Sequence, residues 1–385
     1  MTQTPLTIPA SRYPAGRRPD RPAPLNSPAR ARSRDFHRLT VKRVEALTDD
    51  SAAITLGVPP ELASAFAFAA GQALTVRRGE ERRTYSICSP AGPNIPRALP
   101  RIGVREVAGG AVSGWLVHTV KAGDTLEVQV PSGTFTPDLS APGRHVLIAA
   151  GSGITPMMSI AASVLAADDK STVTLLYGNR RSDTVMFADE VADLKDAYPA
   201  RMQLIHVLSR EPQEVELHSG RLDAERLTAL LPAAVDVAGV DHWWLCGPFT
   251  MVTDAIEVLR QFGVDAGRIH RELFWVGDEP PVEAVHADAA RDADGASLTV
   301  ILDGRSSTLT LPAGTPVLDG AQQARPDLPF ACKGGVCGTC RAKVISGTAV
   351  MRRNYALEQH EIDAGYVLTC QAVPQADEIT VDYDA

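Results

Sequence analysis

The stretch Cys332-Lys-Gly-Gly-Val-Cys337-Gly-Thr-Cys340 determines the fold of the C-terminal part of the chain, because it spaces three cysteines as C-x4-C-x2-C. A fourth cysteine, Cys370, follows further along the chain. Thiolates that converge on one small group require a tightly curled loop, and glycines permit one. The glycines of this stretch are Gly334, Gly335 and Gly338. The stretch therefore predicts a metal-binding loop.

Two other interpretations of these cysteines remain open, a structural zinc site and a disulfide pair. Zinc sites usually have two C-x2-C knuckles, and disulfides are rare inside cells. The spacing matches that of plant-type 2Fe-2S clusters, in which four thiolates hold two irons. We therefore predict that the cluster ligands are Cys332, Cys337, Cys340 and Cys370. The remaining cysteines, Cys88 and Cys246, lie on predicted strands and are expected to be buried.

Length and charge limit the location and the partners of the protein. Its 385 residues are enough for two or three domains, and its formal net charge is -8. We expect it to bind neither nucleic acid nor membrane, because phosphate groups attract clustered Lys and Arg. A basic patch on a partner protein is the expected complement. We expect a cytoplasmic protein, because no apolar run approaches the roughly 20 residues of a membrane-spanning helix and no export signal is recognisable.

The hydrophobic pattern changes along the chain and predicts a multi-domain protein. Short β-type stretches between turn signals favour an antiparallel β-barrel, interrupted by one helix at 112–120. Buried strands that alternate with helices follow, which is typical of an α/β domain with a parallel sheet. The predicted division is a disordered extension (1–35), a barrel (36–137), an α/β domain (138–277), a linker (278–295) and a cysteine-containing domain (296–385).

Two motifs in the barrel suit a flavin nucleotide. On the strand Arg83-Thr-Tyr85-Ser86, alternation directs Arg83 and Tyr85 to one face and Ser86 to the other. A cation, an aromatic ring and a hydroxyl suit the phosphate, ring and N5 of a flavin, although ordinary strand packing is an equal alternative. Gly109-Gly110-Ala-Val112-Ser113 opens the predicted helix, where free N-H groups form either a pyrophosphate site or a plain helix cap.

Two turns in the α/β domain suit a dinucleotide. Gly151-Ser-Gly153-Ile-Thr155-Pro156 joins a buried strand to a helix, and such a turn can bind phosphate or simply connect the two elements. Cys246-Gly247-Pro248 repeats the arrangement, and its cysteine is a candidate to line a nicotinamide pocket. Arg180-Arg181 and Ser209-Arg210 also follow strands, where guanidinium groups either pair with the 2'-phosphate of NADPH or are solvated.

The order of these motifs resembles that of the ferredoxin-NADP reductase superfamily, from about residue 37 to 274. A ferredoxin domain at the C-terminal end is similar to the layout of class IA-type oxygenase reductases. The resemblance becomes more specific in three stretches, Cys332 to Val344, Asn354-Tyr-Ala-Leu-Glu358 and Gly365 to Ala372. These residues closely resemble the reductase subunits of phenylacetyl-CoA 1,2-epoxidases.

The resemblance implies an FAD-binding barrel, an NAD(P)-binding α/β domain and an α+β ferredoxin domain of β-grasp fold. FAD is implied at Arg83, Tyr85, Ser86, Gly110, Val112 and Ser113, and the nicotinamide coenzyme at Gly153, Thr155, Arg180, Ser209, Arg210, Cys246, Gly247 and Pro248. Glu272 and Phe274, in His270-Arg-Glu-Leu-Phe274, resemble the acid and aromatic that close the flavin site. Ser86, Cys246 and Glu272 are the implied catalytic residues. NADPH is the expected coenzyme, with NADH possible.

The implied function is electron transfer from NADPH through FAD and the 2Fe-2S cluster to a di-iron oxygenase that epoxidises phenylacetyl-CoA. Three other functions remain open: a reductase for another oxygenase, such as a steroid or hydrocarbon hydroxylase, a diaphorase that reduces quinones or free flavin, and a non-catalytic redox sensor. We expect the oxygen chemistry to lie on the partner, because the sequence lacks the paired Glu-x-x-His motifs of di-iron helices.

Overall fold

The computed structural model describes residues 6–8, 35–79, 81–274, 295–357 and 359–385. The predicted extension (1–35) lies outside the described residues apart from 6–8 and 35, and the predicted linker (278–295) lies outside them apart from 295. The chain forms two compact units. The larger unit is Ala31–Phe274, and the cysteine unit combines Trp275–Ala385 with Met1–Arg30.

The first part of the larger unit is an antiparallel sheet of six strands in the order β5-β4-β7-β2-β3-β6. A bridge between Ile87 and Ile102, and a 2.7 Å hydrogen bond from Cys88 N to Arg101 O, join the two edges and close the sheet into a barrel. Its elements are β2 (His37–Thr48), β3 (Ser51–Gly57), β4 (Ala73–Arg78), β5 (Glu81–Ser86), β6 (Arg101–Arg105), β7 (Thr125–Val128) and helix α1 (Ala111–His118).

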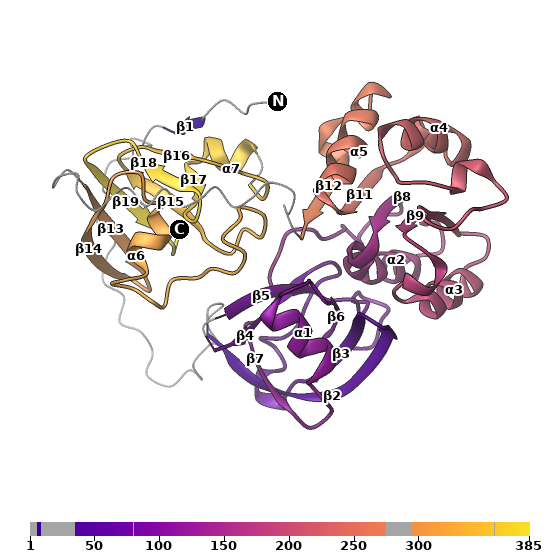
Figure 1. The fold of residues 1–385 in the computed structure, drawn as a ribbon, viewed down its shortest axis with the longest axis horizontal. Helices are drawn as coiled ribbons and strands as arrows, with labels where there is room; N and C mark the ends of the chain where they lie inside the picture. Colours follow the sequence, from indigo (N-terminus) through magenta and orange to yellow (C-terminus); the bar gives the residue numbers. More distant parts are fainter. Residues whose placement is uncertain (1–5, 9–34, 80, 275–294, 358) are drawn as a thin grey trace. The chain divides into compact units, whose positions relative to one another are not determined.

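The second part of the larger unit is a parallel sheet in the order β10-β9-β8-β11-β12. The strand order reverses between β8 and β11, and in such sheets ligands bind at the carboxyl ends of the strands beside this reversal. Figure 1 shows the helices around the sheet. The elements are β8 (Arg144–Ala150), β9 (Thr172–Asn179), β10 (Met202–Leu208), β11 (His242–Gly247), β12 (Ile269–Leu273), α2 (Ile154–Ala167), α3 (Ala188–Ala197), α4 (Ala224–Ala234) and α5 (Phe249–Gln261).

Short 3-10 helices join several of these elements in the larger unit. The first lies in the barrel and the others in the parallel-sheet part. They are η1 (Pro60–Leu62), η2 (Gly151–Gly153), η3 (Ser182–Thr184), η4 (Glu216–His218), η5 (Val237–Gly239) and η6 (Ala266–Arg268).

The cysteine unit is built on a mixed sheet in the order β14-β13-β19-β15-β17, in which only β13 and β19 run parallel. A smaller antiparallel sheet has the order β1-β16-β18. The elements are β1 (Leu6–Ile8), β13 (Ala296–Leu302), β14 (Arg305–Leu311), α6 (Val317–Ala321), β15 (Arg341–Ser346), β16 (Ala349–Met351), α7 (Gln359–Asp363), β17 (Tyr366–Leu368), β18 (Ala372–Pro374) and β19 (Glu378–Asp382).

The architecture confirms the predicted fold class, with an antiparallel barrel, a parallel α/β sheet and an α+β unit. One placement was wrong. Cys88 lies beyond the end of β5, because the chain leaves the strand after Ser86 and returns to β6 only through the Ile87 bridge. Cys88 is nevertheless buried, at 5% exposure. Among the described residues, we find no helix whose length and apolar character would let it cross a membrane.

Candidate functional site

The three predicted catalytic residues, Ser86, Cys246 and Glu272, lie together inside the larger unit. Ser86 at the end of β5 donates a 2.8 Å hydrogen bond from Oγ to Oε2 of Glu272 on β12. Cys246 on β11 is the register partner of Glu272. Ser86 is 3% exposed and Cys246 is 0% exposed, so water has little access to these groups. Residues that lie far apart in the sequence thus form one polar group, in which Ser86 and Cys246 are buried and Glu272 is partly buried.

Burial governs the protonation of this group. The pKa of Glu272 rises to about 7 because its carboxylate is removed from water, and the hydrogen bond from Ser86 opposes that rise. Burial, with the nearby Glu272 charge, raises the pKa of the Cys246 thiol well above its usual range. Cys246 is therefore a neutral thiol near pH 7, whereas Glu272 can both accept and release a proton there.

The turn η2 lies against the end of β11. A Cβ on Gly153 would collide with the backbone carbonyl of Cys246 and would lie 2.9 Å from Gly247 N, so only glycine allows this approach. Thr155 donates a hydrogen bond of 2.9 Å to Ser152 O, and Pro156 occupies the first turn of α2. Gly153, Thr155, Gly247 and Pro248 thus gather at the reversal of strand order, where a dinucleotide is expected to bind.

The helix α1 begins within the predicted motif Gly109-Gly110-Ala-Val112-Ser113. Gly110 is its N-cap residue, and Ser113 Oγ accepts a hydrogen bond of 3.1 Å from Val107 N. Val112 and Ser113 are buried in the first turn, at 2% and 6% exposure. A Cβ on Gly110 would lie 2.6 Å from Ser113 Oγ. The start of α1 therefore combines a close-packed loop with unbonded N-H groups, a combination that suits a pyrophosphate.

The two remaining flavin candidates lie on β5. Tyr85 is packed against the barrel core, and burial raises the pKa of its phenol. Arg83 forms an ion pair of 2.8 Å with Glu81 and is 51% exposed. Arg83 would have to exchange this pair for a phosphate, and such exposed pairs are weak, about 0–1 kcal/mol.

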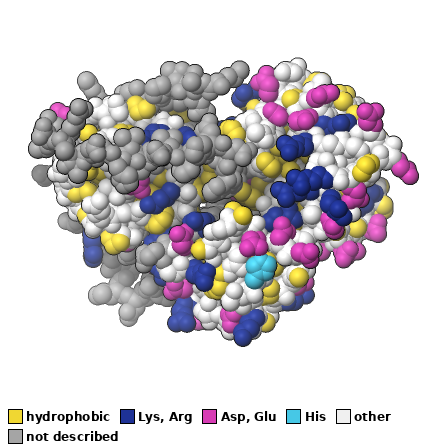
Figure 2. All heavy atoms as spheres, in the orientation of Figure 1, with side chains coloured by type: hydrophobic (Ala, Val, Ile, Leu, Met, Phe, Trp, Pro, Cys, Tyr) yellow, Lys and Arg dark blue, Asp and Glu magenta, His cyan; other side chains and the backbone are white. Residues whose placement is uncertain are grey.

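The coenzyme-selecting candidates lie together at the ends of β9 and β10. Ser209 N donates to Asn179 O at 2.9 Å, and Arg210 N donates to Arg180 O at 2.8 Å. Within the described part of the chain neither the Arg180 nor the Arg210 guanidinium has an ion pair, whereas Arg181 pairs with Asp183 at 3.1 Å. Figure 2 shows Lys and Arg side chains gathered over the part of the larger unit that contains the parallel sheet. Arg180 and Arg210 are thus available to a phosphate.

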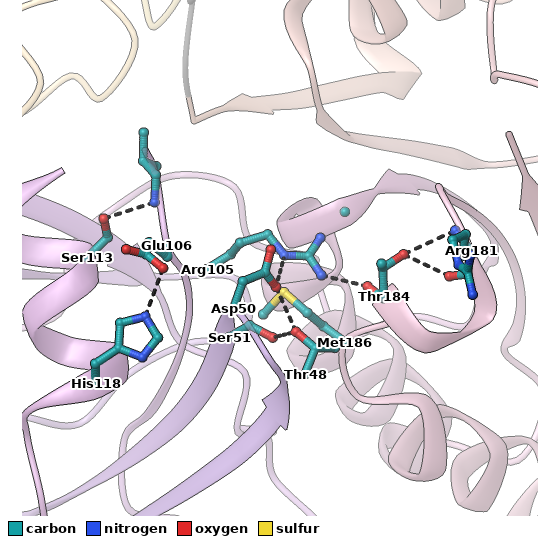
Figure 3. A network of polar contacts seen from close by, with 12 residues as sticks. Thr48, Asp50, Ser51, Arg105, Glu106, Ser113, His118, Arg181, Thr184 and Met186 are labelled. Atoms are coloured by element: carbon teal, nitrogen blue, oxygen red, sulfur yellow. Dashed lines mark hydrogen bonds and ion pairs between the residues drawn. The ribbon is translucent and has the colours of Figure 1, made fainter. Parts of the chain in front are cut away.

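Sequence reasoning missed two arginines of β6 that tie the barrel to the parallel-sheet part. Arg101 forms a bidentate pair of 2.7 and 2.8 Å with Glu190 of α3 and also reaches Glu45 at 3.1 Å. Arg105 bonds Asp50 at 3.1 Å and the carbonyl of Thr184 (Figure 3). The pattern Arg-x-Gly-x-Arg on one strand face was the available signal, since alternation aligns both cations.

The four predicted cluster ligands form two pairs of neighbouring thiols in the cysteine unit, Cys332 with Cys337 and Cys340 with Cys370. A hydrogen bond from Cys337 lowers the pKa of Cys332, and contact with Cys370 is the main reason that the pKa of Cys340 is raised. Cys337 also lies within electrostatic range of Cys340. Among the described residues no group of three His, Cys, Asp or Glu side chains is arranged for a single metal ion. Two adjoining thiol pairs suit a cluster of two irons, each with two thiolates.

The cluster loop curls by left-handed residues, as its glycines predict, with one difference. Gly335 and Gly338 have φ values of 81 and 66°, but Lys333 (φ 52°) takes the third left-handed position in place of Gly334. Tyr355 N donates to Gly335 O at 3.1 Å and Gln371 Nε2 donates to Lys333 O at 2.8 Å. The loop is thereby fixed on both sides.

Comparison with known proteins places these sites in a family. Family models match an oxidoreductase NAD-binding domain at residues 147–257 and a 2Fe-2S iron-sulfur cluster binding domain at residues 300–375, which confirms both predicted modules. The chain is 42% identical to a subunit of the 1,2-phenylacetyl-CoA epoxidase of Escherichia coli (strain K12), over 91% of this chain and 98% of that protein.

Two further relatives share the layout. The chain is 34% identical to the ferredoxin reductase component of the 3-ketosteroid-9-alpha-monooxygenase of Rhodococcus rhodochrous, over 90% of this chain and 96% of that protein. The solved structure of phthalate dioxygenase reductase matches with a TM-score of 0.56 at 24% identity, over 90% of this chain and 98% of that chain. The latter likeness supports the fold alone.

Proposed function

Because this chain belongs to the family of oxygenase reductases that join a flavin- and nicotinamide-binding reductase part to a 2Fe-2S domain, we propose that it carries electrons from NADPH to a di-iron oxygenase that epoxidises phenylacetyl-CoA. We place this reaction in the cytoplasm, where NADPH is a general reductant. The observation that carries the proposal is the presence, on one chain, of the Ser86, Cys246 and Glu272 group and of the paired thiols of the cluster loop.

FAD, when bound, supplies the conversion from a two-electron hydride to the single electrons that a 2Fe-2S cluster accepts. Ser86 would orient toward the flavin ring and Glu272 would hold a proton at Oε2. Cys246, at the end of β11, would lie against the nicotinamide as a neutral thiol. The low exposure of Ser86 and Cys246 would exclude water from the site of hydride transfer.

The phosphate contacts are assigned to backbone and cations. Gly110, Val112 and Ser113 at the start of α1, with Arg83 and Tyr85 on β5, would hold the FAD. Gly153, Thr155, Gly247 and Pro248 would hold the coenzyme pyrophosphate and nicotinamide half. Arg180, Ser209 and Arg210 would bind the 2'-phosphate, which makes NADPH rather than NADH the preferred coenzyme. Phe274 packs against the hydrophobic core that contains Cys246, and it would close the flavin site.

Support for the substrate of the partner comes from the relatives. The identity to the phenylacetyl-CoA epoxidase protein is 42%, against 34% to the steroid monooxygenase component. The residues between Cys340 and Cys370 add to this, because iron ligation does not dictate them. We propose that the di-iron centre and the phenylacetyl-CoA site lie on the oxygenase.

Reconstitution tests this proposal. The purified holoprotein, with FAD and two irons per chain, is mixed with NADPH and the oxygenase component of a phenylacetyl-CoA epoxidase, and product is measured per NADPH consumed. We expect tight coupling. Cys337→Ser should abolish product formation while flavin reduction by NADPH continues, and Cys88→Ala serves as the control for loss of a cysteine that is no ligand. Loss of flavin reduction in a folded Cys337→Ser protein would overturn the proposed order of carriers.

A second candidate function is a reductase for a steroid oxygenase, which the 34% identity over 90% of the chain favours. The same assay with a 3-ketosteroid hydroxylase component separates the two, because coupling to that component alone would exclude the epoxidase. Rapid reduction of quinones without any need for the cluster would identify a diaphorase. A holoprotein that does not oxidise NADPH would identify a redox sensor.

A further inference from the structure

The charges of the cysteine unit are segregated around the cluster loop. Between residues 328 and 357 the sequence contains no Asp or Glu, although the whole chain has a net charge of -8. The same stretch contains every cluster ligand except Cys370. Its basic residues, which we call the basic rim, are Lys333, Arg341, Lys343, Arg352 and Arg353.

Four members of the basic rim adjoin the cluster loop, two by their place in the chain and two by backbone contacts. Lys333 follows Cys332 directly and Arg341 follows Cys340 directly. Arg352 N donates to Gln371 O at 3.0 Å, and a Cβ on Gly335 would lie 3.3 Å from Arg353 O. The segment that contains Arg352 and Arg353 therefore packs on the loop that binds the cluster.

The edge of the cluster site that reaches the surface lies at this rim. Cys340 and Cys370 are 3% and 5% exposed, whereas Cys332 and Cys337 are only partly buried. Lys333, next to the more accessible Cys332, has 45% of its side chain exposed. An electron acceptor must approach this edge closely, and there it meets basic side chains.

Among the contacts found in the described residues, two rim side chains pair with carboxylates. Lys333 pairs with Asp319 at 3.0 Å and Arg341 pairs with Glu361 at 3.1 Å. Both side chains of the Lys333–Asp319 pair are 45% exposed, and such a pair contributes about 0–1 kcal/mol, so a carboxylate of a partner can replace Asp319 at little cost. Glu361 is only 19% exposed, so Arg341 is held more firmly. The side chain of Arg352 is exposed and bonds only a backbone carbonyl, that of Gly314, among the contacts found in the described residues.

We propose that the basic rim docks an acidic patch on the oxygenase component, so that the electron leaves the cluster at Cys332 and Cys337. This inference rests on the proposed function, since it assumes a protein acceptor. The net charge of the chain predicts the opposite, a basic patch on the partner. The local charge prevails because the Debye length at physiological salt is about 8 Å, so that distant acidic residues are screened at the docking surface.

Charge reversal in the full-length holoprotein tests the proposal. The variants are Lys333→Glu and Arg352→Glu, made singly, with Lys333→Gln and Arg352→Gln as milder versions. Arg305→Glu is the matched control, because it makes the same change of charge on β14, which β13 and β19 separate from β15. The two acceptors are the epoxidase oxygenase component and cytochrome c, a basic one-electron acceptor. Each rate is divided by the rate of cluster bleaching by NADPH in the same variant.

With the oxygenase, we expect each reversal to lower kcat/KM about tenfold at low salt, and the loss to shrink toward 1 M salt. With cytochrome c, reversal should raise the rate several-fold. The control should change either rate less than twofold. Unchanged rates with both acceptors would overturn the proposal, as would a rise with cytochrome c but no loss with the oxygenase. If the wild-type protein does not couple to the oxygenase at all, the proposed function fails, and the cytochrome c rates still decide the sign of the docking surface.

Discussion

Ser86 on β5 and Glu272 on β12 are joined by a 2.8 Å hydrogen bond, although they belong to different sheets. Glu272 is partly buried, and its pKa of about 7 results from loss of hydration that the Ser86 hydroxyl only partly offsets. The bond therefore adjusts the proton affinity of the one carboxyl group placed beside Cys246.

Ser86→Ala should raise the pKa of Glu272 further, because the variant removes the donor that stabilises the carboxylate. We expect the pH profile of kcat/KM for NADPH, measured with ferricyanide between pH 5 and 9, to shift upward by about one unit, with a rate loss of about tenfold. A loss of rate with an unshifted profile would contradict a role through Glu272.

Glu272→Gln should separate stability from activity. The folded pKa is raised above that of the unfolded chain, so the carboxyl group destabilises the folded state as pH rises from about 4.5 through about 7. In the cofactor-free protein we therefore expect Glu272→Gln to be more stable than the wild type above pH 7, by up to about 3 kcal/mol. The two should converge below pH 4.5. Urea unfolding at pH 5 and 8 measures this difference, while NADPH oxidation by the variant should fall.

Gly153→Ala should disrupt the nucleotide turn, because the new Cβ would collide with the carbonyl of Cys246. We expect a loss of stability of about 2 kcal/mol or more and a large rise in KM for NADPH. Gly114→Ala in α1 is the control, since its Cβ would meet only the flexible end of Glu106, at 3.2 Å, and alanine favours helix. Thermal unfolding and NADPH titration measure both effects. An unchanged KM in Gly153→Ala would exclude the turn from coenzyme binding.

Arg101→Met should cost about 3 kcal/mol of stability, because Glu190 and Glu45 would lose a cation whose side chain is only 13% exposed. Arg43→Met offers a direct comparison. Arg43 pairs with the same Glu45 at 3.1 Å but is 64% exposed, so its loss should cost less than about 0.5 kcal/mol. Urea unfolding measures both. Equal losses would show that burial does not set the strength of this network.

The sequence predicts the elements better than the contacts between them. Alternating apolar residues in 125–130 and continuous apolar residues in 146–150 suffice to predict β7 and β8, because periodicity is local. The pairing of Ser86 with Glu272 depends on how two sheets approach, which no local pattern encodes; the family resemblance implied that both residues lie at the flavin site but did not predict their hydrogen bond. No local pattern predicts the ion pair of Arg101 with Glu190 either. The left-handed backbone of Lys333 is a further case, because no residue preference predicts it.

Arg210→Gln should weaken the preference for NADPH. Its guanidinium has no carboxylate partner within the described ranges, and it lies beside Arg180 at the ends of β9 and β10. We expect KM for NADPH to rise about tenfold while KM for NADH stays constant, because only NADPH has the 2'-phosphate. Arg181→Gln is the control, since Asp183 already occupies that guanidinium. Equal changes for both coenzymes would assign Arg210 another role.

Three histidines and a tryptophan form a stack on the parallel sheet, and we expect this stack to make the larger unit sensitive to acid. Trp244 stacks on His270 with ring centres 4.2 Å apart, and its Nε1 donates to His145 Nδ1 at 3.2 Å. His242 lies between His145 and His270, and its Nδ1 is 3.2 Å from His270 Nε2. Burial is the main reason that the pKa of His145 and of His270 is lowered to about 4, and electrostatic repulsion from His242 adds to it. The nearby carboxylates of Asp241 and Asp168 oppose the shift at His145.

Because the folded pKa values lie below the usual 6.5, the unfolded chain binds more protons between pH 6.5 and 4, and stability should fall as pH falls through that window. His270→Phe keeps the ring stack but removes one titrating group, so we expect it to reduce the loss of stability between pH 7 and 4.5 by roughly 1–2 kcal/mol. Urea unfolding at four pH values measures the slopes, and an equal slope in His270→Phe and wild type would show that the acid sensitivity arises elsewhere.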